Sequence, residues 1–213
     1  MVQQVRLERE NKMIGKWNKS ELLTYIGLSI AIVGIVLVLC AKDIKYTMVC
    51  FMFSGICDLF DGTFARRFKR TKEEKSFGIE LDSLVDVISF VALPLVILGS
   101  INKRLIFIPI YLIYAIFAIA RLAFFNIDTA DKDKAISYYI GLPVTFAALI
   151  FPVVFLLNYF IDHTIFILIY NIVTILVAIL YILKIKVPKP KLKISISLIF
   201  LAIVMTVLYL IVL

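Results

Sequence analysis

Seven strongly apolar segments, separated by short polar linkers, dominate the chain. They cover residues 22–41, 45–66, 78–100, 104–127, 138–158, 163–183 and 192–213. Each is close to the ~20 apolar residues that an α-helix needs to cross a lipid bilayer. Short linkers are typical of compact helical bundles. The pattern therefore predicts an all-α fold, a polytopic transmembrane helical bundle of about seven spans.

The first twenty residues differ from the rest of the chain. They are polar, carry charges of both signs, and contain neither an apolar core nor a small-residue cleavage site. A cleaved signal peptide has both of these features. We therefore expect residues 1–20 to be a polar cytoplasmic leader that forms an interfacial helix. Residues 21–213 then form the transmembrane domain, and its first helix serves as the insertion signal.

Composition supports a membrane protein and accounts for the basic charge. Hydrophobic residues make up 62% of the chain and the mean hydropathy is +1.03, whereas soluble domains average roughly 45–50% apolar residues. The net charge of +8 fits basic loops held on the cytoplasmic side and in contact with anionic lipid. We expect membrane lipid as a partner and no nucleic acid.

The distribution of Lys and Arg orients the predicted bundle. Alternate linkers, taken with the leader and Arg66, carry 18 of these residues, and the linkers on the opposite side carry four. Only Arg121 falls inside a span. Positive residues stay in the cytoplasm, so we expect a multi-pass protein of the cell membrane with a cytoplasmic N-terminus.

Four aspartates stand out at the cytoplasmic ends of the second and third spans. Asp58 and Asp61 are three residues apart, and Asp82 and Asp86 are four apart. On a helix each pair shares one face. Carboxylates at membrane depth cost roughly 2.5–3.5 kcal/mol each on insertion scales and usually mark a functional site.

Two facing helices with these pairs would present four negative charges to two divalent cations. Oxygen ligands favour Mg²⁺ or Mn²⁺ over zinc, and such a site suits phosphate chemistry. A structural polar network is the alternative for any single aspartate. A cation- or proton-coupled transporter is the alternative from another functional class, and it predicts carboxylates near the bilayer midplane.

The residues around the aspartates resemble the signature of the CDP-alcohol phosphatidyltransferases. The pattern Asp-x2-Asp-Gly-x2-Ala-Arg…Gly-x3-Asp-x3-Asp is matched in full. The matching positions are Asp58, Asp61, Gly62, Ala65, Arg66, Gly78, Asp82 and Asp86. One departure is that eleven residues separate Arg66 from Gly78, where the family usually has about eight. The extra residues fall in a basic loop, where insertions are tolerated.

Three further segments are similar to the phosphatidylserine synthase branch of this family. They are Asp82-Ser-Leu-Val-Asp86 with Ser89-Phe90, the run Ala120 to Asn126, and Ile140-Gly-Leu-Pro143. In the second of them, Phe124 stands where the branch has another Arg. The resemblance covers roughly residues 20–158 and implies a six-helix catalytic core.

The resemblance implies an enzyme of phospholipid biosynthesis. It would transfer a phosphatidyl or archaetidyl group from CDP-diacylglycerol or CDP-archaeol to L-serine and release CMP. Two Mg²⁺ or Mn²⁺ ions, ~3.5–4 Å apart in two-metal sites, would bridge the diphosphate. The implied metal ligands are the four aspartates, with Asp86 also accepting the proton of the attacking hydroxyl.

The chemistry of the residues in and near the signature suggests the substrate sites. CDP would be bound by Asp58, Gly62, Ala65, Arg66 and Gly78, because small residues let a nucleotide approach the helix backbone and an Arg pairs with phosphate. For the acceptor, we expect Arg121, the only basic residue within a predicted span, to hold the serine carboxylate or a phosphate, and Asn126 to add a polar contact. A buried salt bridge from Arg121 to a site carboxylate is an equally weighted alternative.

Other acceptors and the oligomeric state stay open at this point. Glycerol 3-phosphate or inositol phosphate would need more cationic residues near the cleft, and Arg67, Lys69 and Arg70 are close enough in sequence to supply them. Family members are commonly homodimers, so we expect a homodimer.

Overall fold

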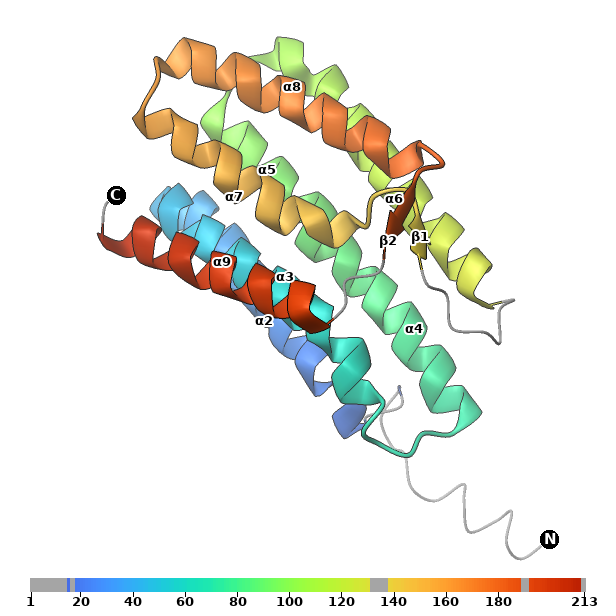
Figure 1. Cartoon of the computed structure of the whole chain (residues 1–213). Coiled ribbons are helices and arrows are strands. Elements are labelled where there is room, and N and C mark those ends of the chain that lie inside the picture. Colours follow the sequence, from blue (N-terminus) through green and yellow to red (C-terminus); the bar gives the residue numbers. More distant parts are fainter. Residues whose placement is uncertain (1–14, 16–17, 131–137, 189–191, 212–213) are drawn as a thin grey trace, which may run out of the picture.

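The computed structural model describes residues 15, 18–130, 138–188 and 192–211. Most of the predicted leader, residues 1–20, lies outside the described residues. The described residues form seven helical segments (Figure 1). In chain order these are η1–α2–η2 (Lys19–Glu21, Leu22–Val36, Leu37–Ala41), α3 (Ile44–Ala65), α4–η3–α5 (Lys72–Asp86, Val87–Ala92, Leu93–Ile101), η4–α6 (Leu105–Phe107, Ile108–Ala130), η5–α7–η6 (Val144–Phe146, Ala147–Phe155, Leu156–Tyr159), α8 (His163–Ile182) and α9 (Leu192–Ile211).

The described helices pack as an all-α bundle around the rod formed by α4, η3 and α5. Figure 1 shows this rod running through the middle of the view, with α2, α3 and α9 on one side and α6 and α8 on the other. The most extensive helix contacts are between α2 and α3 and between α6 and α8, and α3 also contacts α7 and α9. The central position of this rod places the third span's aspartates inside the bundle.

Small residues allow some of these helices to approach closely. An ideal Cβ built on Gly55 of α3 would lie 2.6 Å from the Cβ of Ala148 of α7. No side chain fits at that separation, so only glycine permits this α3–α7 contact. Such contacts are characteristic of helix packing in membranes.

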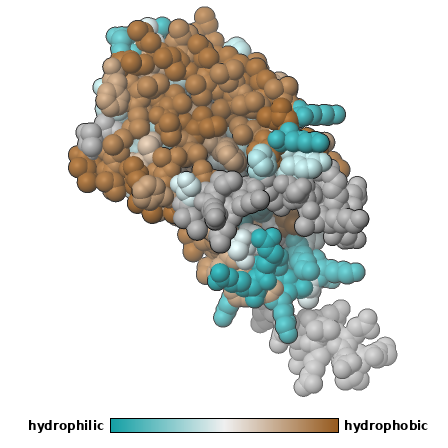
Figure 2. Space-filling model, viewed as in Figure 1, coloured by the Kyte–Doolittle hydropathy of each residue, from teal (hydrophilic) through white to brown (hydrophobic). Residues whose placement is uncertain are grey.

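The outer surface is that of a multi-pass membrane protein. Five helical segments are long and apolar enough to cross a bilayer, and two shorter apolar helices, Val144–Tyr159 and Ser197–Ile211, accompany them. Figure 2 shows hydrophobic side chains over most of the visible face, and hydrophilic ones gathered where α3 ends and α4 begins. The predicted fold class is confirmed.

The third helical segment begins six residues before the predicted boundary at residue 78. Thr71 and Glu74 form a capping box, in which the Thr71 hydroxyl accepts from the Glu74 amide (3.2 Å) and the Glu74 carboxylate accepts from the Thr71 amide (2.7 Å). This cap satisfies two backbone amides that a helix start leaves unpaired. The predicted loop 67–77 is therefore wrong in its second half, which is the start of α4.

The predicted fifth span, 138–158, is wrong in its first residues. Tyr138–Ile140 form strand β1, which pairs antiparallel with β2 (Lys186–Pro188). Gly141 then adopts φ +77° and donates its amide to the Ile185 carbonyl at 2.8 Å. A positive φ suits glycine and interrupts a helix, so the helical segment begins only at Val144.

Candidate active site

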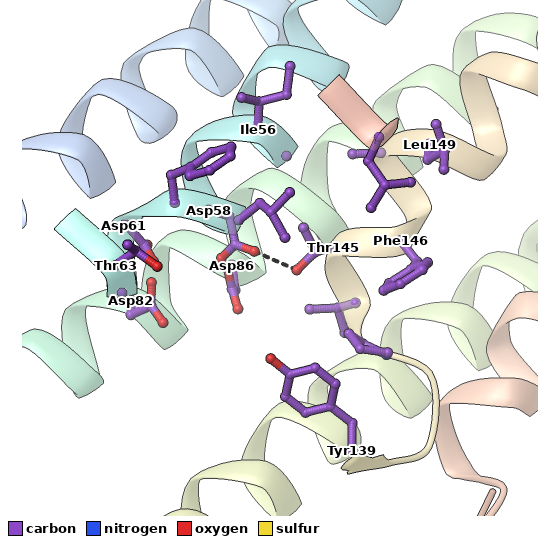
Figure 3. A pocket seen from close by; sticks show the side chains of 18 of the residues that line it. Ile56, Asp58, Asp61, Thr63, Asp82, Asp86, Tyr139, Thr145, Phe146 and Leu149 are labelled. Carbon is purple, nitrogen blue, oxygen red and sulfur yellow. Dashed lines mark hydrogen bonds between the residues drawn. The ribbon is translucent and has the colours of Figure 1, made fainter. Parts of the chain in front are cut away.

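The site is a cavity of about 680 Å³ between α3, α4, α6, α7, α9 and strand β1. One part of its wall is polar and carries the aspartates (Figure 3). Another part of the wall is apolar. It is built by Met52, Ile56, Leu59 and Phe60 of α3, Phe146 and Leu149 of η5 and α7, and Leu198, Ile199 and Ala202 of α9. The cavity can therefore hold a molecule that has both a charged and a hydrocarbon part.

Three of the four predicted aspartates converge on one point. Asp58, Asp82 and Asp86 each present a carboxylate oxygen, and these oxygens all lie within 4.8 Å of one another. The helical spacings bring this about, since α3 and α4 each turn one carboxylate-bearing face toward the other. Asp86 is the most buried of the three, at 8% exposed.

Asp61 lies at the edge of the same cluster. It lines the cavity beside Asp82, as Figure 3 shows. Its carboxylate also accepts a hydrogen bond from the Thr24 hydroxyl of α2 at 3.4 Å. The first helix therefore contacts the cluster as well.

The cluster fits divalent cations. Two oxygens bound to one cation at ~2.0–2.6 Å lie at most about 4–5 Å apart, which matches the spacing of the three carboxylates. Oδ1 of Asp86 is buried and has no hydrogen-bond partner among the described residues. Negative charges buried this close together repel each other, and metal coordination is a usual way to compensate them.

Thr145 is a site residue that sequence reasoning missed. Its hydroxyl, in η5, donates to Asp58 at 2.6 Å (Figure 3). Thr145 lies two residues after the Gly-Leu-Pro element. This position was the only feature of the sequence that could have pointed to it as a site residue. The hydrogen bond fixes one oxygen of Asp58 and leaves the carboxylate's other acceptor positions for a cation.

The residues predicted to bind CDP divide into two groups. Gly62 and Arg66 line the cavity, and an ideal Cβ on Gly62 would meet nothing within 4 Å. The Arg66 guanidinium donates to the Thr63 hydroxyl at 3.0 Å. Ala65 is buried, and Gly78 lies beside η1, where its ideal Cβ would lie 3.2 Å from Oε1 of Glu21. Neither of these two lines the cavity.

The two predicted acceptor residues are also separated. Arg121 of α6 lines the cavity, is only 5% exposed, and lies over the Phe125 ring at 5.2 Å from its centroid. Asn126 does not line it. Its side chain exchanges hydrogen bonds with the Ser83 hydroxyl, at 2.7 and 3.1 Å, and so joins α6 to α4.

Tyr139 is the second site residue that the sequence did not indicate. It lies on β1, lines the cavity, and packs on Phe125 with ring centroids 5.8 Å apart. Figure 3 shows its hydroxyl pointing toward the aspartates. Burial, and then the charge of Asp58, raises the pKa of this hydroxyl above its ordinary value. It therefore remains a hydrogen-bond donor at neutral pH.

The sequence profile of the CDP-alcohol phosphatidyltransferase family matches residues 17–213. The chain belongs to this family. The resemblance of its aspartate signature is thereby confirmed.

Curated relatives from a bacterium and a yeast are similar to this chain. A CDP-diacylglycerol–serine O-phosphatidyltransferase of Helicobacter pylori strain 26695 is 34% identical over 130 residues, which are 59% of this chain and 53% of that protein. The protein of the same name from Saccharomyces cerevisiae is 36% identical over 101 residues, 44% of this chain and 36% of that protein. The chain thus spans about half the length, or less, of the curated relatives it matches.

The structure also locates the longer spacing in this member of the family. The eleven residues between Arg66 and Gly78 divide into a turn and the first turns of α4. Arg67, Lys69 and Arg70 of that turn do not line the cavity. Residues 72–77 of this spacing therefore belong to α4.

Proposed function

We propose that this protein is a phosphatidylserine synthase of phospholipid biosynthesis. It transfers the phosphatidyl group of CDP-diacylglycerol to L-serine and releases CMP. The observation that carries this proposal is that the carboxylate cluster, an apolar wall and the buried cation Arg121 line one and the same cavity. The names of the curated relatives support serine as the acceptor.

The four aspartates would hold two divalent cations, Mg²⁺ or Mn²⁺. When bound, these cations neutralise the diphosphate and stabilise the charge that develops on the departing CMP. Asp58 would be kept in its orientation by Thr145. Arg66 would pair with a phosphate, and the open surface at Gly62 would let the nucleotide lie against α3.

The lipid chains of the donor would occupy the apolar wall between α3, α7 and α9. That wall is built from apolar side chains. Such a wall accepts ester-linked and ether-linked chains alike, so CDP-archaeol is an equally compatible donor.

The acceptor serine would enter on the side of Arg121, which would bind its carboxylate. Asp86 would accept the proton of the serine hydroxyl as the serine oxygen bonds to the lipid-bearing phosphorus. The bond from that phosphorus to the CMP oxygen breaks, and CMP leaves with the electron pair. Holding the two reactants in this alignment supplies much of the acceleration.

Glycerol 3-phosphate and inositol phosphate are the alternative acceptors. Both bring a phosphate, and Arg66 and Arg121 are the cations that line the cavity in the described part of the chain. If Arg66 is engaged by the donor, Arg121 alone faces the acceptor, which suits a single carboxylate better. This division favours serine.

The decisive experiment measures CMP release by detergent-purified protein with CDP-diacylglycerol and Mn²⁺ or Mg²⁺. Serine, glycerol 3-phosphate and inositol phosphate are compared, with Asp86→Asn as the control. Serine-dependent release that is lost in Asp86→Asn, while its thermal unfolding is retained, supports the proposal. Release with another acceptor alone would overturn the choice of serine. Ion flux in vesicles without CMP release would instead favour the cation-coupled transporter.

We also propose that the protein is a homodimer of the cell membrane, with the N-terminus and the site facing the cytoplasm. The excess of Lys and Arg in the linkers on that side supports this orientation.

A further inference from the structure

Two fully buried tyrosines on α6 and α8 touch each other and are not among the residues that line the cavity. Tyr114 of α6 is 0% exposed and Tyr181 of α8 is 1% exposed. Their hydroxyl oxygens are 3.3 Å apart, and their ring centroids 5.7 Å. Neither residue belongs to the family signature, and neither contacts the cavity. Their hydroxyl groups nevertheless contact the backbone near Asp86 and the backbone next to Thr145, the residue that holds Asp58.

Tyr114 compensates a break in the helix that carries Asp86. In an α-helix the amide of residue 94 would donate to the carbonyl of residue 90, but residue 94 is a proline and has no N–H. The helix widens here into the π-helical segment η3, in which the Leu93 amide donates to the Ile88 carbonyl. The Tyr114 hydroxyl donates to the carbonyl of Phe90 at 2.7 Å. This carbonyl lies one turn beyond Asp86.

Tyr181 extends the contact to the other half of the site. The single proton of Tyr114 is committed to Phe90, so the proton of Tyr181 is shared between Tyr114 and the Val144 carbonyl, which is 3.5 Å away. The next residue, Thr145, holds Asp58 through its hydroxyl at 2.6 Å. A continuous run of polar contacts therefore joins the backbone after Asp86 to the side chain that orients Asp58.

We infer that Tyr114 and Tyr181 are positioning residues that set the separation of Asp86 and Asp58 for cation binding. π-Helical segments are frequent at functional sites, and this one lies immediately after a carboxylate of the cluster. Without the tyrosine hydroxyls, the Phe90 carbonyl loses its hydrogen bond from Tyr114, and the contact that holds this wide turn against α6 is lost. Asp86 would then rotate relative to Asp58. The catalytic consequence rests on the proposed function, whereas the effect on cation binding does not.

The chain provides a matched control for this inference. Tyr209 of α9 is also 0% exposed, and its hydroxyl donates to the Pro152 carbonyl of α7 at 2.6 Å. Tyr209→Phe therefore removes the same kind of buried hydrogen bond from a pair of helices without aspartates. A decrease in thermal stability or in Mn²⁺ affinity that both Tyr114→Phe and Tyr209→Phe show is attributed to general destabilisation of the fold.

The test measures Mn²⁺ binding to purified protein by electron paramagnetic resonance of free Mn²⁺, together with thermal unfolding. Mutation of a residue that holds a metal ligand in place typically lowers metal affinity by about 10–100-fold. We expect Tyr114→Phe to raise the Kd for Mn²⁺ about tenfold, and Tyr209→Phe to leave it within about twofold. Tyr181→Phe should raise the Kd less, and it serves as the second variant if Tyr114→Phe does not fold.

The outcomes separate the inference from the proposed function. Equal losses of thermal stability in Tyr114→Phe and Tyr209→Phe with unchanged Mn²⁺ binding in both would overturn the positioning role. If the wild type binds Mn²⁺ but releases no CMP with serine, the proposed function fails and the positioning role is still decided by the Kd values. If CMP release is found, saturating Mn²⁺ should restore it in Tyr114→Phe, because the variant keeps every ligand.

Discussion

At the scale of single residues, the candidate site combines the aspartates with side chains that hydrogen-bond to them, such as Thr145. Local spacing identified the four aspartates, because i, i+3 and i, i+4 positions share a helix face whatever the rest of the chain does. Thr145 could not be found in this way. It lies 87 residues from Asp58 along the chain, and only tertiary packing of α7 on α3 brings the two together.

The first prediction concerns this threonine. Thr145→Val keeps the shape of the side chain but removes the hydroxyl that donates to Asp58. We expect the concentration of Mn²⁺ for half-maximal CMP release to rise about tenfold, because Asp58 loses its fixed orientation. Thr145→Ser retains the donor and should behave close to the wild type. Equal behaviour of the Val and Ser variants would mean that the hydrogen bond does not serve cation binding.

The second prediction concerns the two adjacent tyrosines of β1. Successive strand residues point to opposite faces, so Tyr139 faces the cavity while Tyr138 lies against Lys186, with its ring centroid 5.1 Å from Nζ. If the Tyr139 hydroxyl donates a hydrogen bond to the bound acceptor, Tyr139→Phe weakens the binding free energy of the acceptor by about 1 kcal/mol. We expect the KM for serine to rise several-fold with little change in the KM for the CDP-lipid. Tyr138→Phe is the control and should change neither. A rise in the KM for CDP-lipid alone would place Tyr139 on the donor.

At the scale of elements, the hydropathy pattern predicted which segments are helical, but tertiary contacts decide where the helices begin. The capping box at Thr71 and Glu74 was readable in the sequence, yet the charged residues after it suggested a loop. Strand β1 was not predicted, because residues 138–140 directly precede the apolar segment and the pattern assigns them to its start. It forms only because β2, more than 40 residues later, supplies a partner edge.

The third prediction tests the close approach of α3 and α7. Gly55→Ala places a Cβ that would lie 2.6 Å from the Cβ of Ala148, and neither atom belongs to a flexible side chain. Overpacking of this kind costs about 1–3 kcal/mol, so we expect a clearly lower unfolding temperature in detergent. CMP release should also fall, because α3 carries Asp58 and α7 follows Thr145.

Gly99 of α5 provides the matched control for this helix contact. It is exposed, and an ideal Cβ there meets nothing within 4 Å. Since alanine is favoured over glycine in helices by about 1 kcal/mol, Gly99→Ala should leave the unfolding temperature unchanged or raise it slightly. If both alanine variants unfold at the same temperature, the α3–α7 contact is not limited by the size of residue 55.

At the scale of the whole molecule, the arrangement joins two environments in one cavity. The carboxylates lie near the cytoplasmic ends that the sequence predicts for the second and third spans, and the apolar wall of the same cavity reaches α9. A lipid-linked nucleotide requires both environments at once, because its diphosphate is charged and its chains are hydrocarbon. The sequence predicted the charged half, since that half is local to two adjacent helices. The apolar half draws on α3, α7 and α9, so it is visible only in the folded chain.

The last prediction concerns orientation, which follows from charge alone. Lys72 begins α4 on the strongly basic side, and Lys103 lies in the turn between α5 and α6 on the other side. Both are exposed. With Cys40, which is the exposed native thiol among the described residues, replaced by serine, each lysine is changed to cysteine in turn. Because basic linkers remain in the cytoplasm, a membrane-impermeant maleimide added to intact cells should label Lys103→Cys. Lys72→Cys should react only after the membrane is opened. The reverse pattern would place the aspartates on the outer face and would contradict an enzyme that draws serine and divalent cations from the cytoplasm.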